Sequence, residues 1–422
     1  MTTPWSQRYA QRMQWMSSSV IRELLKLTDR PEVISFAGGL PAPELFPIET
    51  VERAATKVLR EQGSRALQYS TTEGYRPLRE FIVERMSRYG IPARAENVLI
   101  TSGSQQALDM IGKILINPGD RVLTEEPTYL GALQAWRAYQ ADFVTVPLDD
   151  DGLCCDDRLE EALCAGPKFM YVLPNFHNPG GVTLSLERRK RIVEVGDRYG
   201  IPIIEDDPYG QLRFEGDHLP PLLVLDAERL NHRDHGNGNS NGYFRDGNVI
   251  YLSTFSKTLA PGLRLGWIVA PEPVIQRCVM AKQGMDLHTS TFDQMVAYEV
   301  VHDGFLDEHV RKIRRVYSER RDLMLEMLER HFPPEARWTR PQGGLFLWVT
   351  LPEGIDTAEL LPVAVEHNVA FVPGMAFHPG GGPSSSFRLN FSSSTPEQIE
   401  TGMRRLGEVV AEALEQSRAV PA

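Results

Sequence analysis

Short apolar runs alternate with amphipathic segments over residues 97–270. Continuous apolar runs are typical of strands buried on both faces, and their alternation with helices predicts an α/β fold with a mostly parallel sheet sandwiched by helices. The pattern predicts seven strands, at residues 98–101, 121–124, 143–146, 169–173, 202–205, 249–253 and 265–269.

Helices are predicted where apolar residues recur every three or four positions. Residues 185–199 fit this period, with Ser185 as N-cap and Gly200 as the stop. The other predicted helices of the first part are 17–28, 75–89 and 105–116.

After residue 304 the pattern changes to a long charged helix at 305–331, strands around 345–349, 370–372 and 387–391, and a last helix at 396–417. This change predicts a smaller α+β domain. We expect three parts: an N-terminal segment, 1–48, that packs with the small domain and the substrate site; a large domain, 49–310; and a small C-terminal domain, 311–422.

Composition excludes several classes of protein. The chain of 422 residues has 45 Lys and Arg against 56 Asp and Glu, a net charge of −11, which argues against nucleic-acid binding. Apolar runs fall short of the ~18 residues of a membrane span, and the polar N-terminus lacks a secretory pattern, so a cytoplasmic protein is expected. Four cysteines without a C-x-x-C spacing predict neither disulfides nor a metal site. The polar stretch 231–247 is predicted to be a surface loop with no assigned role.

The densest chemical signal is the segment 253–266, which begins where a predicted strand ends. Lys257, among hydroxyl and small residues, suits a Schiff base with a phosphorylated aldehyde cofactor. Arg264 offers a cation that lowers the pKa of the amine and a planar fork for a phosphate. The alternative is that Lys257 is a solvated loop lysine.

Acidic and amide side chains follow two other predicted strands. Asp206 or Asp207 could pair with a protonated pyridine nitrogen, or could be a turn residue before Pro208. Asn178 and Tyr209 could donate to the phenolic oxygen of such a cofactor, although Asn-Pro-Gly is also a good turn.

Two further strand ends add to this pattern. Ser104, at a helix start, could hold a phosphate with the exposed N–H groups there, or be a plain helix cap. Tyr129 could stack on a flat ring, or be a core tyrosine. All these residues lie at the carboxyl ends of predicted strands, where open α/β sheets bind ligands. In the small domain, Arg388 lies within an alternating strand, where it either meets a substrate carboxylate or faces solvent.

With these residues the sequence resembles the class I, fold-type I pyridoxal-phosphate aminotransferases, closest to the 2-aminoadipate and kynurenine/aminoadipate branch. The resemblance covers nearly the whole chain. Its most specific stretches are 34–41, 67–70, 103–108, 178–181, 205–209, 255–264, 281–284 and 387–390. Thr254, where many relatives have serine, and Gly180, where threonine is commoner, depart from the pattern.

The resemblance implies a role for each matching residue. Lys257 resembles the lysine that forms the internal aldimine, Asp206 the partner of the ring nitrogen and Arg388 the clamp of the α-carboxylate. Asn178 and Tyr209 match the partners of the phenolic oxygen, and Tyr129 the stacking aromatic. The phosphate site would comprise Ser104, Gln105, Thr254, Ser256 and Arg264.

Some implied roles concern a second subunit and the substrate. Tyr69 resembles a tyrosine that reaches the phosphate of the neighbouring cofactor, which implies a homodimer. Ser19, Arg22, Gly39 and Asn178 match substrate-binding positions, with Arg22 the candidate for a distal carboxylate. Arg22 could instead pair with an acid on a solvated helix face.

The resemblance implies ping-pong transamination through the Lys257 aldimine, with pyridoxal 5'-phosphate as cofactor. The expected donors are 2-aminoadipate, glutamate and, in addition, leucine or aromatic amino acids, with an acceptor such as 2-oxoglutarate, as in lysine biosynthesis. Two alternatives remain: a non-catalytic sensor that binds the cofactor, against which the lack of a basic N-terminal module counts, and a lyase or decarboxylase on the same fold.

Overall fold

The computed structural model describes residues 3–16, 30, 32–90, 93–233 and 246–419. Its largest unit is an eight-stranded sheet in the order β2-β9-β8-β7-β6-β3-β4-β5. The strands are β2 (Val98–Thr101), β3 (Arg121–Glu126), β4 (Asp142–Asp149), β5 (Gly152–Leu153), β6 (Met170–Val172), β7 (Ile203–Asp206), β8 (Val249–Thr254) and β9 (Gly266–Val269).

All seven predicted strands are present, and the short edge strand β5 is an addition. Strands β8, β7, β6, β3 and β4 pair in parallel, whereas β9 is antiparallel to both β8 and β2. β5 could not be predicted because two residues are too few to show a period. It follows β4 directly and pairs with it in antiparallel.

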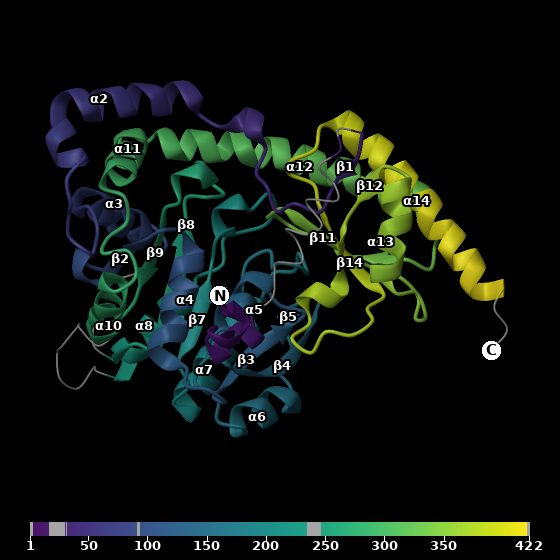
Figure 1. Cartoon of the computed structure of the whole chain (residues 1–422), viewed down its shortest axis with the longest axis horizontal. Coiled ribbons are helices and arrows are strands. Elements are labelled where there is room, and N and C mark those ends of the chain that lie inside the picture. The colour runs from purple at the N-terminus through teal and green to yellow at the C-terminus, as the bar shows by residue number, and fades with distance from the viewer. Residues whose placement is uncertain (1–2, 17–29, 31, 91–92, 234–245, 420–422) are drawn as a thin grey trace.

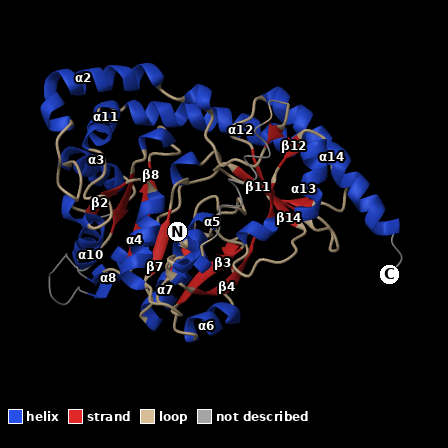
Figure 2. Cartoon of the chain, in the orientation of Figure 1, coloured by secondary structure: helices blue, strands red, loops and turns tan. Residues whose placement is uncertain are grey.

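Helices cover both faces of this sheet (Figure 2). One face packs on α4 (Ser104–Leu115), α5 (Leu130–Arg137) and α10 (Glu272–Gln283). The other packs on α2 (Ile48–Ala66), α3 (Arg76–Ser87), α6 (Asp157–Cys164), α7 (Leu186–Tyr199), α8 (Leu222–Arg233) and α11 (Thr291–Val301). Successive residues of β8 alternate between the two cores, so this strand is buried on both faces as its apolar sequence predicts.

The predicted helix boundaries hold to within a few residues. α7 begins after Ser185, although that side chain makes no capping hydrogen bond, and ends at Gly200, whose φ of +65° suits glycine. The helix predicted at 17–28 lies outside the described residues. No helix within the described part of the chain is long and apolar enough to cross a membrane.

The smaller unit is built on the antiparallel sheet β10-β11-β14-β13. Its elements are β10 (Arg337–Trp338), β11 (Phe346–Thr350), α13 (Thr357–Glu366), β12 (Val369–Ala370), β13 (Val372–Pro373), β14 (Ser386–Asn390) and α14 (Pro396–Ala419). The single strand predicted at 370–372 is two short strands, because β12 pairs with β1 (Ile34–Ser35) and β13 with β14.

The N-terminal segment after residue 32 packs on this smaller unit. β1 pairs in parallel with β12, and Phe36, Ala37 and Leu45 belong to the core of the small sheet. The segment therefore forms part of the core of the smaller unit.

Helix α12 (Phe305–His331) runs along one edge of the molecule and joins the two units (Figure 1). Leu306 and Val310 belong to the core beside the large sheet, whereas Ile313 and Tyr317 belong to the core of the small one. We therefore propose that the domains meet within α12, between Val310 and Ile313.

Candidate active site

A cavity of about 400 Å³ opens where the parallel strands of the large sheet end. Most of the residues predicted from the sequence line it: Gly39, Ser104, Gln105, Tyr129, Asn178, Asp206, Tyr209, Thr254, Ser256, Lys257, Arg264 and Arg388. The other lining residues are Leu173, Pro208, Pro261 and Phe346. The fold thus gathers into one site side chains that lie hundreds of residues apart.

Lys257 lies just after β8 and points into the cavity. Its Nζ donates a hydrogen bond of 2.7 Å to the carbonyl oxygen of Gly39, from the N-terminal segment. Burial, with the cations of Arg388 and Arg264 nearby, lowers the pKa of Lys257 to about 8. Lys257 is therefore held inside the cavity by the protein, so the alternative of a solvated loop lysine is wrong. Its lowered pKa favours the neutral amine.

The structure separates the two neighbouring aspartates. Asp206, on the same face of the strand as Ile204, faces the α4 and α5 side and lines the cavity. Its Oδ2 accepts a hydrogen bond of 2.8 Å from Tyr171. Its Oδ1 is buried and has no hydrogen-bond partner among the described residues. Burial raises the pKa of Asp206 to about 7, while the Tyr171 hydrogen bond acts in the opposite direction.

Asp207 is a structural residue of the following turn. Its carboxylate accepts hydrogen bonds from the Asn175 side chain at 2.9 Å, the Gly210 backbone N–H at 2.8 Å and the Tyr251 hydroxyl at 3.0 Å. The turn alternative therefore applies to Asp207, and Asp206 is the acid that faces the cavity.

Arg388, on β14, is only 1% exposed, so the solvent-facing alternative is wrong. Its Nη1 donates to Asn178 Oδ1 at 2.7 Å and its Nη2 to the Ala37 carbonyl at 2.8 Å. The guanidinium carbon lies 4.2 Å from the ring centre of Phe346 and 5.0 Å from that of Phe377. Burial lowers the pKa of Arg388 to about 10, and a carboxylate ligand would offset that cost.

Asn178 joins Arg388 to Tyr209. The Asn178 side-chain nitrogen lies 3.5 Å from the Tyr209 hydroxyl, and Tyr209 is buried, which raises the pKa of its phenol. Tyr129 is the N-cap residue of α5. A Cβ at position 131 would come within 2.5 Å of its ring, so Gly131 is what leaves room for this tyrosine.

The first turn of α4 has the features of an anion-binding site. The N-cap residue Gly103 has a φ of +81°, and a Cβ there would come within 2.5 Å of Nη2 of Arg264. Exposed N–H groups at a helix start and an adjacent guanidinium attract a phosphate. Thr254 Oγ1 accepts the Ser256 backbone N–H at 3.0 Å, which orders the neighbouring hydroxyl loop. The Gln105 side chain donates to the Gly131 carbonyl at 2.7 Å, while the Gln105 backbone N–H belongs to the first turn of α4 beside the cavity.

Tyr69, which was also predicted, does not line this cavity. Tyr69 is 78% exposed and lies with its ring edge toward His288, 5.9 Å between ring centres. Ser19 and Arg22 lie outside the described residues, as do residues 234–245 of the predicted loop. The four cysteines are free, and within the described ranges no cluster of three or more His, Cys, Asp or Glu could hold a metal.

The sequence reasoning missed Tyr171 and Phe346. Tyr171 lies inside the apolar strand predicted at 169–173, and a phenol in a fully buried strand requires a polar partner. That requirement was a usable signal. Phe346 carried no such signal, because an apolar residue in a strand is ordinary core.

Comparison with known proteins identifies the family. The model of the family "Aminotransferase class I and II" matches residues 33–406. The chain is 46% identical to the 2-aminoadipate transaminase of Thermus thermophilus over 96% of each chain. It is 45% identical to aromatic-amino-acid aminotransferase 1 of Thermococcus litoralis, over 98% of this chain and 96% of the relative.

A solved structure agrees with these matches. The α-aminoadipate aminotransferase LysN of Thermus thermophilus, complexed with N-(5'-phosphopyridoxyl)-L-leucine, has a TM-score of 0.89 and 43% identity and covers 98% of this chain and 100% of its own. The chain therefore belongs to the class I aminotransferases of fold type I, in the branch of the 2-aminoadipate and kynurenine/aminoadipate enzymes, and is a pyridoxal-phosphate-dependent transaminase.

Proposed function

We propose that this transaminase moves the amino group of 2-aminoadipate or glutamate, and also of leucine and aromatic amino acids, to 2-oxoglutarate. The observation that carries the proposal is the shared cavity of Lys257 and the buried Arg388, which combines an amine of lowered pKa with a carboxylate clamp. Relatives named for aminoadipate and for aromatic amino acids support a broad donor range.

The residues present fit the cofactor. Asp206 Oδ1 is a buried acceptor without a partner in the described part of the chain, as a site for a protonated ring nitrogen requires. The α4 start, Arg264 and the hydroxyls of Ser104, Thr254 and Ser256 would hold the phosphate. Tyr129 would stack on the ring, and Asn178 with Tyr209 would donate to its phenolic oxygen. When bound, pyridoxal phosphate supplies an electron-withdrawing ring that stabilises negative charge at the substrate α-carbon.

We propose that Lys257 is the base. With its pKa lowered to about 8, a useful fraction of Nζ is neutral at pH 7, and this neutral amine would take the proton from the substrate α-carbon and return it to the aldehyde carbon of the cofactor. Asp206 would hold the proton at the ring nitrogen. The Tyr171 hydroxyl stabilises the carboxylate form of Asp206, and a charged Asp206 would keep the ring nitrogen protonated.

Arg388 orients both substrates. An amino acid and a 2-oxo acid each carry a carboxylate next to the reacting carbon, so one planar clamp serves both in turn. This supports a ping-pong order at a single site. Gly39, whose carbonyl holds Lys257, places the N-terminal segment against the same reacting group.

We propose a homodimer in which Tyr69 reaches the partner's cofactor. Tyr69 and Leu67 are 78% and 74% exposed, and the Tyr69 ring contacts His288, which follows Leu287, itself 46% exposed. Exposed apolar side chains near one another are typical of an interface. A cytoplasmic location and a role in lysine biosynthesis stay predictions.

A donor panel with 2-oxoglutarate tests the substrate proposal. We expect pyridoxal-phosphate-dependent glutamate formation from 2-aminoadipate, leucine and aromatic donors. Arg22→Ala should reduce kcat/KM for 2-aminoadipate and leave kcat/KM for leucine unchanged. An unchanged preference would refute the role of Arg22. Release of CO₂ or ammonia without amino transfer would favour the lyase or decarboxylase alternative.

A further inference from the structure

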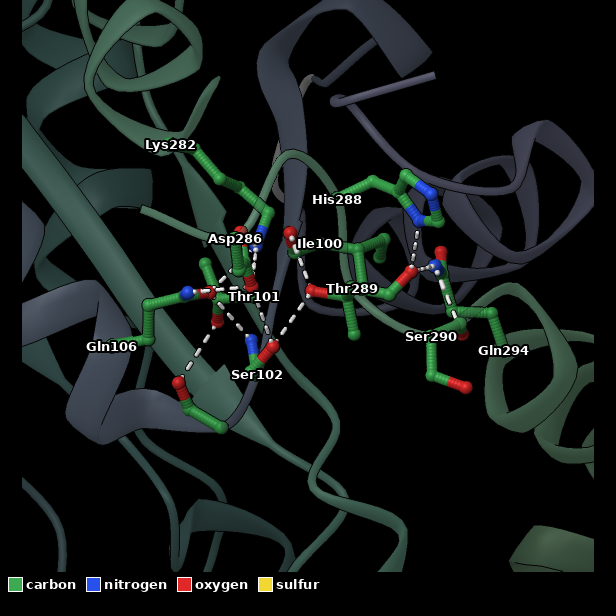
Figure 3. A network of polar contacts seen from close by, with 11 residues as sticks. Ile100, Thr101, Ser102, Gln106, Lys282, Asp286, His288, Thr289, Ser290 and Gln294 are labelled. Carbon is green, nitrogen blue, oxygen red and sulfur yellow. Dashed lines mark hydrogen bonds and ion pairs between the residues drawn. The ribbon is translucent and has the colours of Figure 1, made fainter. Parts of the chain in front are cut away.

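Lys282 lies in the last turn of α10, and its side chain is 0% exposed. Its Nζ contacts Gln106 Oε1 at 2.7 Å and both carboxylate oxygens of Asp286 at 2.9 Å (Figure 3). A buried ammonium is costly unless it is paired and hydrogen-bonded. These protein acceptors match its three donors, so Lys282 holds other side chains in place.

Gln106 is the centre of this network. Its Oε1 also accepts the Ser102 backbone N–H at 2.8 Å, and its Nε2 donates to Asp286 Oδ2 at 2.7 Å. Both ends of the amide are therefore fixed in one orientation. Ser102 Oγ donates to the same Asp286 oxygen at 3.0 Å and lies 3.2 Å from Thr289 Oγ1 (Figure 3).

Ser102 and Gly103 form the turn that leads from β2 into α4. The network thus holds, from outside the cavity, the N-cap segment of α4, where Gly103 packs closely against the guanidinium of Arg264. Such donors bind an anion strongly only when they are fixed before it arrives.

The segment 286–289 also supports the residues that carry Tyr69. His288 Nε2 accepts the Ser70 backbone N–H at 3.2 Å, and Nδ1 lies 2.8 Å from the Thr289 carbonyl. With the proton on Nδ1, both contacts are satisfied. The Thr289 carbonyl further accepts Gln294 Nε2 at 2.8 Å, and Gln294 Oε1 accepts the Tyr75 N–H at 2.7 Å.

We propose that Lys282, Asp286 and Gln106 are positioning residues for the phosphate of the cofactor. They hold the Ser102–Gly103 turn so that the start of α4 is already shaped for the anion. The proposal rests on the phosphate site proposed above. Its consequence is that these residues determine how strongly the protein prefers pyridoxal phosphate over pyridoxal, although none of them lines the cavity.

The test titrates the apoenzyme with pyridoxal phosphate and with pyridoxal and follows the absorbance of each bound aldehyde. Lys282→Met and Gln106→Leu are compared with Lys113→Met, which removes an exposed lysine from α4. We expect the two network variants to lose on the order of 10-fold in affinity for pyridoxal phosphate, with pyridoxal affinity unchanged. Lys113→Met should bind both aldehydes with the affinity of the wild type.

If these residues had only a structural role, the variants would bind pyridoxal phosphate and pyridoxal with equally reduced affinity. That result, or unchanged affinity for both aldehydes, would overturn the proposal. Gln106→Leu leaves the Lys282–Asp286 ion pair intact, so it gives an answer even if Lys282→Met fails to fold. Lys282→Arg should recover part of the preference.

Arg264→Met separates this inference from the phosphate site itself. If Arg264→Met retains the wild-type preference for the phosphorylated aldehyde, the proposed phosphate site is wrong. If Arg264→Met loses the preference while Lys282→Met and Gln106→Leu keep it, only the positioning role is wrong.

Discussion

The hydroxyl of Tyr171 donates a 2.8 Å hydrogen bond to Oδ2 of Asp206, at a position where Oδ1 has no partner in the described part of the protein. Both residues are buried, and Tyr171 packs its ring edge against Trp136, 5.0 Å between centres. The bond stabilises the carboxylate against burial, which raises the pKa of Asp206 to about 7. Tyr171 therefore helps to keep Asp206 charged.

Tyr171→Phe should raise the pKa of Asp206 further, because it removes a hydrogen bond that favours the charged form. The acid limb of the pH profile of kcat/KM should move to higher pH, and kcat/KM at pH 7 should fall about 10-fold, since losing one bond to a buried charge costs about 1–3 kcal/mol. Steady-state kinetics over a range of pH measure both effects.

Tyr251→Phe is the matched control. It removes a hydrogen bond of 3.0 Å to Asp207, which holds a turn on the other side of the strand. This control should cost stability without moving the acid limb. Equal shifts in the two variants would contradict the role of Tyr171.

Lys257→Met should stabilise the apoenzyme at pH 7. The pKa of Lys257 is lowered from 10.5 to about 8, so between these values the unfolded chain binds more protons than the folded one. Stability of the wild type should rise with pH across this window, and below it the burial penalty is fully present. We expect a gain on the order of 1–2 kcal/mol at pH 7.

Denaturant unfolding of the two apoenzymes at pH 7 and pH 10 measures this effect. The difference between them should shrink as the pH rises, and Lys113→Met should show no such trend. A wild type more stable than Lys257→Met at pH 7 would show that Lys257 is not strained by burial.

Arg388→Lys should weaken the binding of both substrates but leave the binding of the cofactor intact. A lysine keeps the charge but cannot reproduce the planar contacts to Asn178 and Ala37. We expect kcat/KM to fall on the order of 100-fold for donor and acceptor alike, as for a loss of about 3 kcal/mol. Cofactor affinity should stay within about twofold of the wild type. Unchanged kinetics would remove Arg388 from the substrate site.

Mixed dimers test the placement of Tyr69. Subunits with Lys257→Ala and subunits with Tyr69→Ala are each expected to be inactive or strongly impaired alone. If Tyr69 reaches the partner's cofactor, the mixed dimer contains one complete site, and mixing should restore a substantial share of the activity. If Tyr69 acts within its own chain, no complete site forms and mixing restores nothing. Sedimentation measures the oligomer in parallel.

The apolar periodicity predicted the seven main strands and the helices because these elements depend on neighbours a few residues away. Residues 305–331 fit one helical period throughout, and α12 has those bounds. Strand β5 and the break at Phe371 were not predictable, since both depend on which distant strand lies alongside.

The sequence by itself determined which side chains stand at strand ends, and so the chemistry available: an amine, an acid, an arginine and a helix start. Only the tertiary structure decided which of them meet. Lys257 contacts Gly39 across 218 residues of sequence, and Arg388 contacts Asn178 across 210. The tertiary structure also determined that Asp206, and not Asp207, faces the cavity. Neighbouring side chains of a strand point to opposite faces, and only packing determines which face holds the cavity.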